Sequence, residues 1–209
     1  MKWFDKVSQL ESTVKTRLRI KKEKEPNKMQ GSDDVWVGEG TKVYENAVIK
    51  NNVIIGEDCV IGNGAIIRDN VILGDNVVVG QSAEIKNSEV GSGVIVGPVA
   101  YVGDSIVRKG AMLGAMVRTS NNRLDGRDIS VMRGQELVET DMAKLGCYIG
   151  NFASLGIGVI VYPGREIGRD ALVEPNIVVK KNVKPEMKIG LRQEFVVEKV
   201  NMADSRREV

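Results

Sequence analysis

The aliphatic residues of this chain recur every six positions over most of its length. A helix would repeat at about 3.6 residues and a flat strand at about two, so this period fits neither. It is typical of a short strand followed by a corner, with three such sides closing a triangular coil. The first series runs through Val37, Val43, Ile49, Ile55, Ile61, Ile67, Leu73, Val79 and Ile85.

The residues between the aliphatic positions supply the corners. A small or β-branched residue follows each aliphatic position by four, and polar pairs such as Asn51-Asn52 and Asp75-Asn76 stand between them. Asn, Asp and Gly tolerate the left-handed backbone conformation that a tight corner needs. We therefore predict an all-β fold, a left-handed parallel β-helix over residues 35–185.

The repeat is not uniform. Its phase slips by one residue at Val90 and again at Val107, and a second clean run begins at Ile149. In the second run Arg165 takes the place of a small residue, the one exception. We expect the slips to mark remodelled corners or emerging loops.

Residues 1–34 form a separate unit. Trp3, Val7, Leu10 and Val14 are spaced as one face of an amphipathic helix, which a basic stretch and a linker follow. We expect the helix to pack on the barrel or to cover its open end, because an uncapped β-helix exposes strand edges. A basic helix that binds a membrane or a partner is the alternative.

Two further segments lie outside the repeat. Residues 118–146 form an inserted arm, with a predicted hairpin turn at Arg133-Gly134, and such an arm typically reaches a neighbouring subunit. The tail, residues 186–209, is predicted to add a strand at residues 195–197 and then to fray. Phe152 and Ile157 fall at outward corners, which suggests a packed surface such as a trimer interface.

Composition excludes several classes of protein. The 30 Lys and Arg residues nearly balance 28 Asp and Glu, so the net charge of +2 gives no sign of nucleic-acid binding. No apolar run approaches the ~20 residues of a membrane span, and we expect a cytoplasmic protein. Cys59 and Cys147 form no CxxC pair, which favours reduced thiols.

Several motifs lie along the barrel: Glu84-Ile85-Lys86-Asn87-Ser88, Tyr101-Val102-Gly103-Asp104-Ser105, Asn121-Asn122-Arg123-Leu124-Asp125-Gly126, Lys144-Leu145-Gly146 and Tyr162-Pro163-Gly164. In them the chain resembles the C-terminal hexapeptide-repeat domain of glucosamine-1-phosphate N-acetyltransferases, above all that of archaeal bifunctional sugar-1-phosphate nucleotidylyltransferases. The resemblance covers roughly residues 35–185, without the nucleotidylyltransferase domain.

The resemblance implies a homotrimer that transfers an acyl group from acetyl-CoA to an amino sugar. The implied substrate-binding residues are Lys86 at the sugar phosphate, Tyr101 and Asn121 at the sugar, and Lys144. The implied coenzyme A-binding residues are Gly156, Gly164 and Lys181.

The chain also departs from the family pattern. The general base of the family is a His, and its position is Pro98 here; the whole chain contains no histidine. A His-ligated zinc site is thereby excluded, and with it a γ-type carbonic anhydrase, so no metal is predicted. Tyr101 and Asp104 are the candidate substitutes for the base, and the catalytic residue stays open.

Two functions follow from these observations. The first is a coenzyme A-dependent N-acetyltransferase acting on an amino-sugar phosphate or a nucleotide sugar. The second is a non-catalytic trimeric scaffold or ligand-binding subunit that partners a sugar nucleotidyltransferase. The missing His favours the second, whereas Lys86, Tyr101 and Asn121 favour the first.

Overall fold

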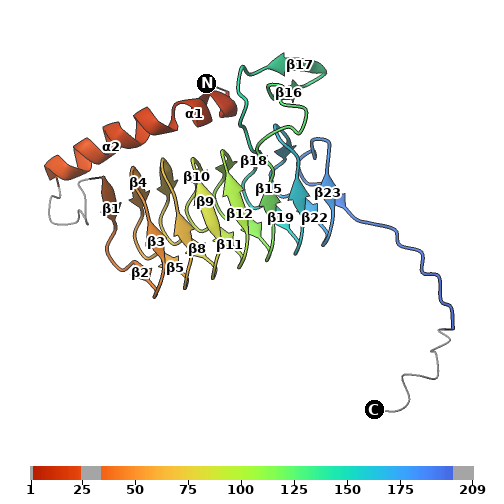
Figure 1. Ribbon diagram of the computed structural model, residues 1–209, viewed down its shortest axis with the longest axis horizontal. Coiled ribbons are helices and arrows are strands. Elements are labelled where there is room, and N and C mark those ends of the chain that lie inside the picture. The colour runs from red at the N-terminus through yellow and green to blue at the C-terminus, as the bar shows by residue number, and fades with distance from the viewer. Residues whose placement is uncertain (1, 25–33, 200–209) are drawn as a thin grey trace, which may run out of the picture.

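A computed structural model describes residues 2–24 and 34–199, and it confirms the predicted parallel β-helix. Short strands stack into three parallel sheets that run the length of the molecule, with coil following coil (Figure 1). We name these sheets A, B and C. The chain passes from A to B to C in each coil and then enters the next.

The strands of each sheet are given in their hydrogen-bonded order. Sheet A contains β1 (Val35–Val37), β4 (Val53–Ile55), β7 (Val71–Leu73), β10 (Glu89–Val90), β13 (Ile106–Val107), β18 (Tyr148–Ile149) and β21 (Glu166–Ile167). Sheet B contains β2 (Lys42–Val43), β5 (Val60–Ile61), β8 (Val78–Val79), β11 (Ile95–Val96), β14 (Met112–Leu113), β19 (Ser154–Leu155), β22 (Leu172–Val173) and β24 (Lys188–Ile189). Sheet C contains β3 (Val48–Ile49), β6 (Ile66–Ile67), β9 (Glu84–Lys86), β12 (Tyr101–Gly103), β15 (Arg118–Thr119), β20 (Ile160–Val161) and β23 (Val178–Val179).

The aliphatic positions of the six-residue repeat line the inside of the triangle. Ile55, Ile61 and Ile67 of one coil are fully buried, and their counterparts in later coils continue the same core. Val43 is the exception: it lies in the first coil, which has no coil before it, and is 43% exposed.

The corners follow the predicted turn chemistry. In each polar pair the second residue has a positive φ, as Asn52, Asp58, Asn70 and Asn76 show. Val99 departs from this pattern, because it is a β-branched residue at φ 58°. The left-handed region costs such a residue about 1–2 kcal/mol, so this corner is strained.

Two N-terminal helices lie along the outside of sheet A (Figure 1). They are α1 (Trp3–Ser8) and α2 (Leu10–Lys24). The buried contact between α2 and the sheet is made by Leu10, Val14, Leu18, Trp36, Ile54 and Ile72. The helix therefore covers a side of the barrel rather than its end, and its apolar face is not free for a membrane. No helix among the described residues is long and apolar enough to cross one.

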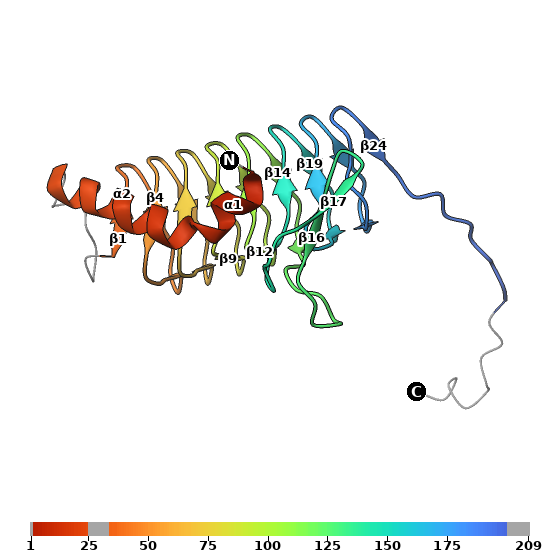
Figure 2. The same cartoon turned by 90° about the horizontal axis from the view of Figure 1, so that it is seen from above.

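The inserted arm is a hairpin of β16 (Ser130–Arg133) and β17 (Glu136–Glu139) that projects beside the barrel (Figure 2). Its turn lies at Gly134-Gln135, one residue later than predicted, because Arg133 still pairs with Glu136. Ile129 at the base of the arm packs against α1 in a second buried cluster. Contact of the arm with another subunit stays a prediction.

The strand predicted at residues 195–197 is wrong. After β24 the chain leaves the barrel and runs extended without a neighbouring strand (Figure 1). Phe195 is consequently 82% exposed. Residues 200–209, where the tail was predicted to fray, lie outside the described residues, as does most of the linker after α2. Cys59 and Cys147 are buried free thiols, in line with the reduced state that we expected.

Replacing Leu10 with alanine should destabilise the protein by about 2–5 kcal/mol, because it removes a fully buried side chain between α2 and sheet A. Ile20→Ala changes the same helix at a side chain that is 43% exposed, and should alter the free energy of unfolding by less than about 0.5 kcal/mol. Urea unfolding of the two variants tests this. Equal effects would contradict the packing described here.

Candidate functional site

The two phase slips of the repeat are two shortened corners between sheets C and A. Ile72 pairs with Glu89 and Glu89 pairs with Ile106, a spacing of 17 residues, whereas Ile54 and Ile72 are 18 residues apart. Each shortened coil thus lacks one residue. Both deletions fall just before sheet A, at Ser88 and Ser105.

Buried hydroxyl groups hold the shortened corners together. Ser88 and Ser105 are fully buried. The Ser105 backbone N–H donates to Ser88 Oγ at 3.1 Å, and the Cys147 N–H donates to Ser105 Oγ at 3.0 Å. This ladder continues into the first coil after the arm and fixes the backbone of the residue that precedes each serine, Asn87 or Asp104.

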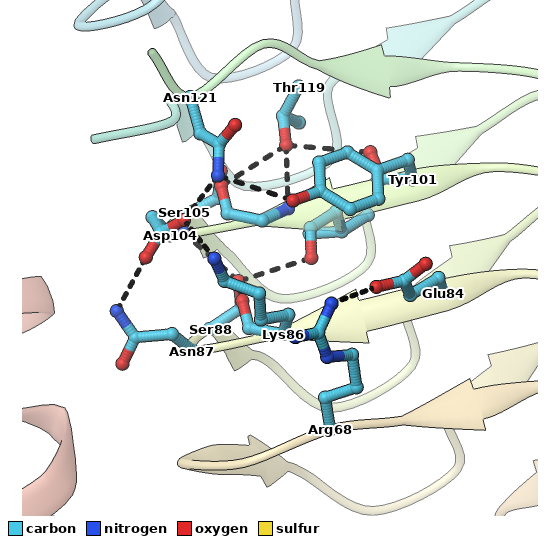
Figure 3. A network of polar contacts seen from close by, with 12 residues as sticks. Arg68, Glu84, Lys86, Asn87, Ser88, Tyr101, Asp104, Ser105, Thr119 and Asn121 are labelled. Atoms are coloured by element: carbon cyan, nitrogen blue, oxygen red, sulfur yellow. Dashed lines mark hydrogen bonds and ion pairs between the residues drawn. The ribbon is translucent and has the colours of Figure 1, made fainter. Parts of the chain in front are cut away.

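Asp104 is the centre of a polar network at these corners (Figure 3). Its Oδ1 accepts a hydrogen bond from Asn87 Nδ2 at 2.8 Å, and its Oδ2 accepts one from Asn121 Nδ2 at 2.5 Å. Lys86 Nζ lies 3.3 Å from the same Oδ2, with side chains 18% and 6% exposed. The carboxylate therefore orients three side chains at once.

Tyr101 joins the network from the outer face of sheet C. Asn121 Nδ2 donates to its hydroxyl oxygen at 3.2 Å. The ring lies over Gly103, where a Cβ would come within 2.5 Å of the Tyr101 hydroxyl oxygen, so Gly103 makes room for it. Partial burial, together with the negative charges of Asp104 and Glu84, raises the pKa of Tyr101 against the opposing effect of Lys86. The phenol is accordingly protonated at neutral pH.

The structure adds Arg68, which we did not single out from the sequence. Its Nη1 donates to Glu84 Oε1 at 2.8 Å, one coil away from Lys86 (Figure 3). Both cations follow the inward-pointing residue of a strand in sheet C. The signal was present: Arg68 precedes Lys86 by 18 residues, one full coil.

A groove of about 370 Å³ opens between this network and the N-terminal helices. Arg68, Lys86 and Asp104 line its barrel side, and Ser8 and Glu11 line the helix side. The helices that cover sheet A thus also form a wall of the candidate site.

Two of the predicted residues lie elsewhere, at the corner between sheets B and C. Pro98 precedes β12 there, at the opposite end of the strand from Asp104. Gly156 occupies the same corner two coils later, where its backbone packs against Pro175. The family base position is therefore not part of the network around Asp104 within this chain.

The remaining predicted residues lie near the arm. Lys144 is exposed, and its neighbour Leu145 donates a backbone hydrogen bond to the Asn121 carbonyl at 2.9 Å. Gly164 has φ +69°, and a Cβ there would meet Ser130 at the base of the arm. Lys181 is exposed at the next corner. No three His, Cys, Asp or Glu side chains in the described ranges are grouped to hold a metal ion.

Comparisons with known proteins agree with the fold. The model of the bacterial transferase hexapeptide (six repeats) matches residues 32–63 and 52–87. An uncharacterized acetyltransferase, YaiX, of Escherichia coli O6:K15:H31 (strain 536 / UPEC) is 40% identical over 167 residues, which cover 80% of this chain and 72% of that protein. The chain therefore belongs to the hexapeptide-repeat acetyltransferase family.

The specific resemblance seen in the sequence is only a partial match. The bifunctional sugar-1-phosphate nucleotidylyltransferase/acetyltransferase of Sulfurisphaera tokodaii is 30% identical over 102 residues, 49% of this chain and 25% of that enzyme. Among solved structures, the Francisella novicida UDP-N-acetylglucosamine acyltransferase has a TM-score of 0.48 at 20% identity, over 68% of this chain and 53% of that one.

Asp104→Asn should destabilise the protein by about 3 kcal/mol, since it leaves the nearly buried Lys86 ammonium without its counter-charge. Asp125→Asn is the matched control, because Asp125 pairs with Arg123 at the surface with side chains 40% and 45% exposed. We expect this control to unfold at nearly the same urea concentration as the unmodified chain. A comparable loss in both variants would show that Asp104 is not the centre of the network.

Proposed function

We propose that the protein is a coenzyme A-dependent N-acyltransferase whose acceptor is an amino sugar, either phosphorylated or nucleotide-linked. Family membership supports acetyl transfer. The network of Lys86, Tyr101, Asp104 and Asn121 carries the choice of acceptor, because amides, a phenol and paired charges suit the hydroxyl groups of a sugar. A cytoplasmic location belongs to the same proposal, and the free thiols support it.

In this reaction the amine nitrogen of the acceptor attacks the thioester carbonyl of acetyl-CoA. A C–N bond forms, the C–S bond breaks, the coenzyme leaves as its thiol, and the nitrogen loses one proton. A general base that takes this proton typically contributes about 10²- to 10⁴-fold. The enzyme would otherwise act by holding the two reactants in line.

The side chains of the site offer no ready base. Tyr101 is protonated at neutral pH, because its pKa is raised. Asp104 accepts hydrogen bonds from Asn87 and Asn121 and pairs with Lys86. We infer that the acceptor enters with its amine already neutral and gives its proton to water. The rate should then rise with pH until the amine itself is deprotonated.

Pro98→His should raise the rate of coenzyme A release, because it restores a group that titrates near pH 6.5 at the position of the family base. The assay uses acetyl-CoA and glucosamine-1-phosphate at several pH values. A gain of about tenfold or more below pH 8, lost again in a Pro98→His, Lys86→Gln double variant, is the expected result.

The unmodified chain distinguishes the two candidate functions. Turnover without a histidine supports a transferase that works by positioning. If neither the unmodified chain nor Pro98→His releases coenzyme A, the scaffold or ligand-binding subunit that partners a nucleotidyltransferase becomes the better account.

We also propose that the protein is a homotrimer that buries the outer face of sheet B. The helices and the arm cover sheet A, whereas Ile95 and Met112 on sheet B are 45% and 50% exposed. Phe152 at one edge of this face and Ile157 at the other are 55% and 43% exposed, and neither the arm nor the described tail covers them. Such an apolar surface suits contact with another copy.

Light scattering should therefore give a mass of about three times 22.8 kDa. Ile95→Glu places a charge in the centre of the face and should shift the mass toward that of one chain. Lys42→Glu, at an exposed end of the same sheet, is the control and should leave the mass unchanged. A single-chain mass for the unmodified protein rules the trimer out.

A further inference from the structure

A second cavity, of about 490 Å³, lies where the arm leaves the barrel. Arg123, Leu124 and Ser130 line it on the arm side, and Tyr162, Pro163 and Arg165 line it on the barrel side. We call it the arm cavity. It shares no lining residue with the groove beside Asp104.

Arg165 is the most unusual group in the arm cavity. Its position in the coil corresponds to Ser105 and Cys147 of the preceding coils, which are small and buried. The guanidinium instead turns toward the arm, where Nε donates to Pro163 O at 3.1 Å and Nη2 donates to Ser130 O at 3.3 Å. Over residues 2–24 and 34–199, no carboxylate forms an ion pair with it.

A second cation faces Arg165. Burial lowers the pKa of Arg165, and the positive charge of Arg123 lowers it further. Arg123 is itself held by Asp125, with Nε 2.8 Å from Oδ1. Lys180 Nζ lies 5.7 Å from the centre of the Tyr162 ring, at the rim of the cavity. The arm cavity thus carries an excess of positive charge that an anion would relieve.

The groove beside Asp104 has the opposite character. Its two cations are each matched by a carboxylate: Lys86 pairs with Asp104 and Arg68 pairs with Glu84. A dianionic phosphate in that groove would compete with partners already in place. Arg165, by contrast, keeps guanidinium N–H donors beyond its two backbone carbonyls, and a guanidinium binds phosphate in a forked geometry.

The arm cavity also offers surfaces for a flat ring. The side chain of Leu124 is fully exposed, and Tyr162 is 42% exposed. The cavity adjoins the first site through the backbone: Asn121 turns toward Asp104, whereas its neighbours Ser120 and Asn122 line the arm cavity. A ligand in one site therefore lies next to a ligand in the other.

We propose that the arm cavity binds the nucleotide phosphate of a substrate, with Arg165 and Arg123 on the phosphate and Leu124 and Tyr162 against the base. This deepens the proposed function, on which it rests. The same chemistry has two sources, the adenosine 3′,5′-bisphosphate end of coenzyme A and the nucleoside diphosphate of a nucleotide sugar.

Calorimetric titration of the full chain with adenosine 3′,5′-bisphosphate and with UDP tests the proposal and separates the two sources. One of them should bind, and Arg165→Gln and Arg123→Gln should each weaken that binding by about tenfold or more. Arg169→Gln removes the same charge from an exposed ion pair with Glu186 and should have no effect. Arg123 is exposed, so its variant keeps the test valid if Arg165→Gln fails to fold.

The outcomes separate this inference from the proposed reaction. Binding that is lost in both cavity variants supports the inference even if no acyl transfer occurs. Absence of binding by either nucleotide, or equal binding in the unmodified chain and both variants, overturns it, whatever the transferase assay shows. In an active enzyme, Arg165→Gln should raise KM for the substrate that carries the nucleotide while kcat changes little.

Discussion

The stacking of one coil on the next is the constraint on which the rest of this structure depends. Every coil donates and accepts backbone hydrogen bonds along its three sides, as from Gly38 N to Ile55 O and from Gly56 N to Leu73 O. Neighbouring coils must therefore have the same outline. A change of length in one coil is tolerated only at a corner, where the backbone can turn without breaking a sheet. The two deletions and the arm all fall at the corner between sheets C and A.

The polar site is a consequence of those shortened corners. With one residue removed, the left-handed corner residue is Asn87 in one coil and Asp104 in the next, and their side chains meet. The serines that follow are drawn into the core and fix both backbones. A buried carboxylate is costly unless donors surround it, and Asn87, Asn121 and Lys86 meet that need. Irregularity in the repeat and chemistry in the site thus have one origin.

The regular part of the fold was predictable because each residue in it answers to a local rule. The period of six identified the buried column, and the polar pairs identified the left-handed corners at Asn52 and Asn76. The spacing of Val7, Leu10 and Val14 identified the buried face of the helix, but not the sheet that it covers. That choice depends on Trp36, Ile54 and Ile72, whose outward direction the pattern does not encode. Arg68 was overlooked for a similar reason, since its relation to Lys86 exists only after coils stack.

The distribution of paired and unpaired charge divides the two sites into different roles. Charges that neutralise each other within the groove leave oriented hydrogen-bonding groups, which recognise hydroxyl groups without a large desolvation cost for a dianion. A guanidinium held by two carbonyl oxygens and facing a second guanidinium is stable only because water screens it, so an anion that replaces this water gains directly. Because Asn121 and its neighbours form the wall between the sites, the sugar and the phosphate of the bound substrates can be adjacent without sharing a contact. This arrangement lets the chain position an amine and a thioester even though the family base is replaced by Pro98.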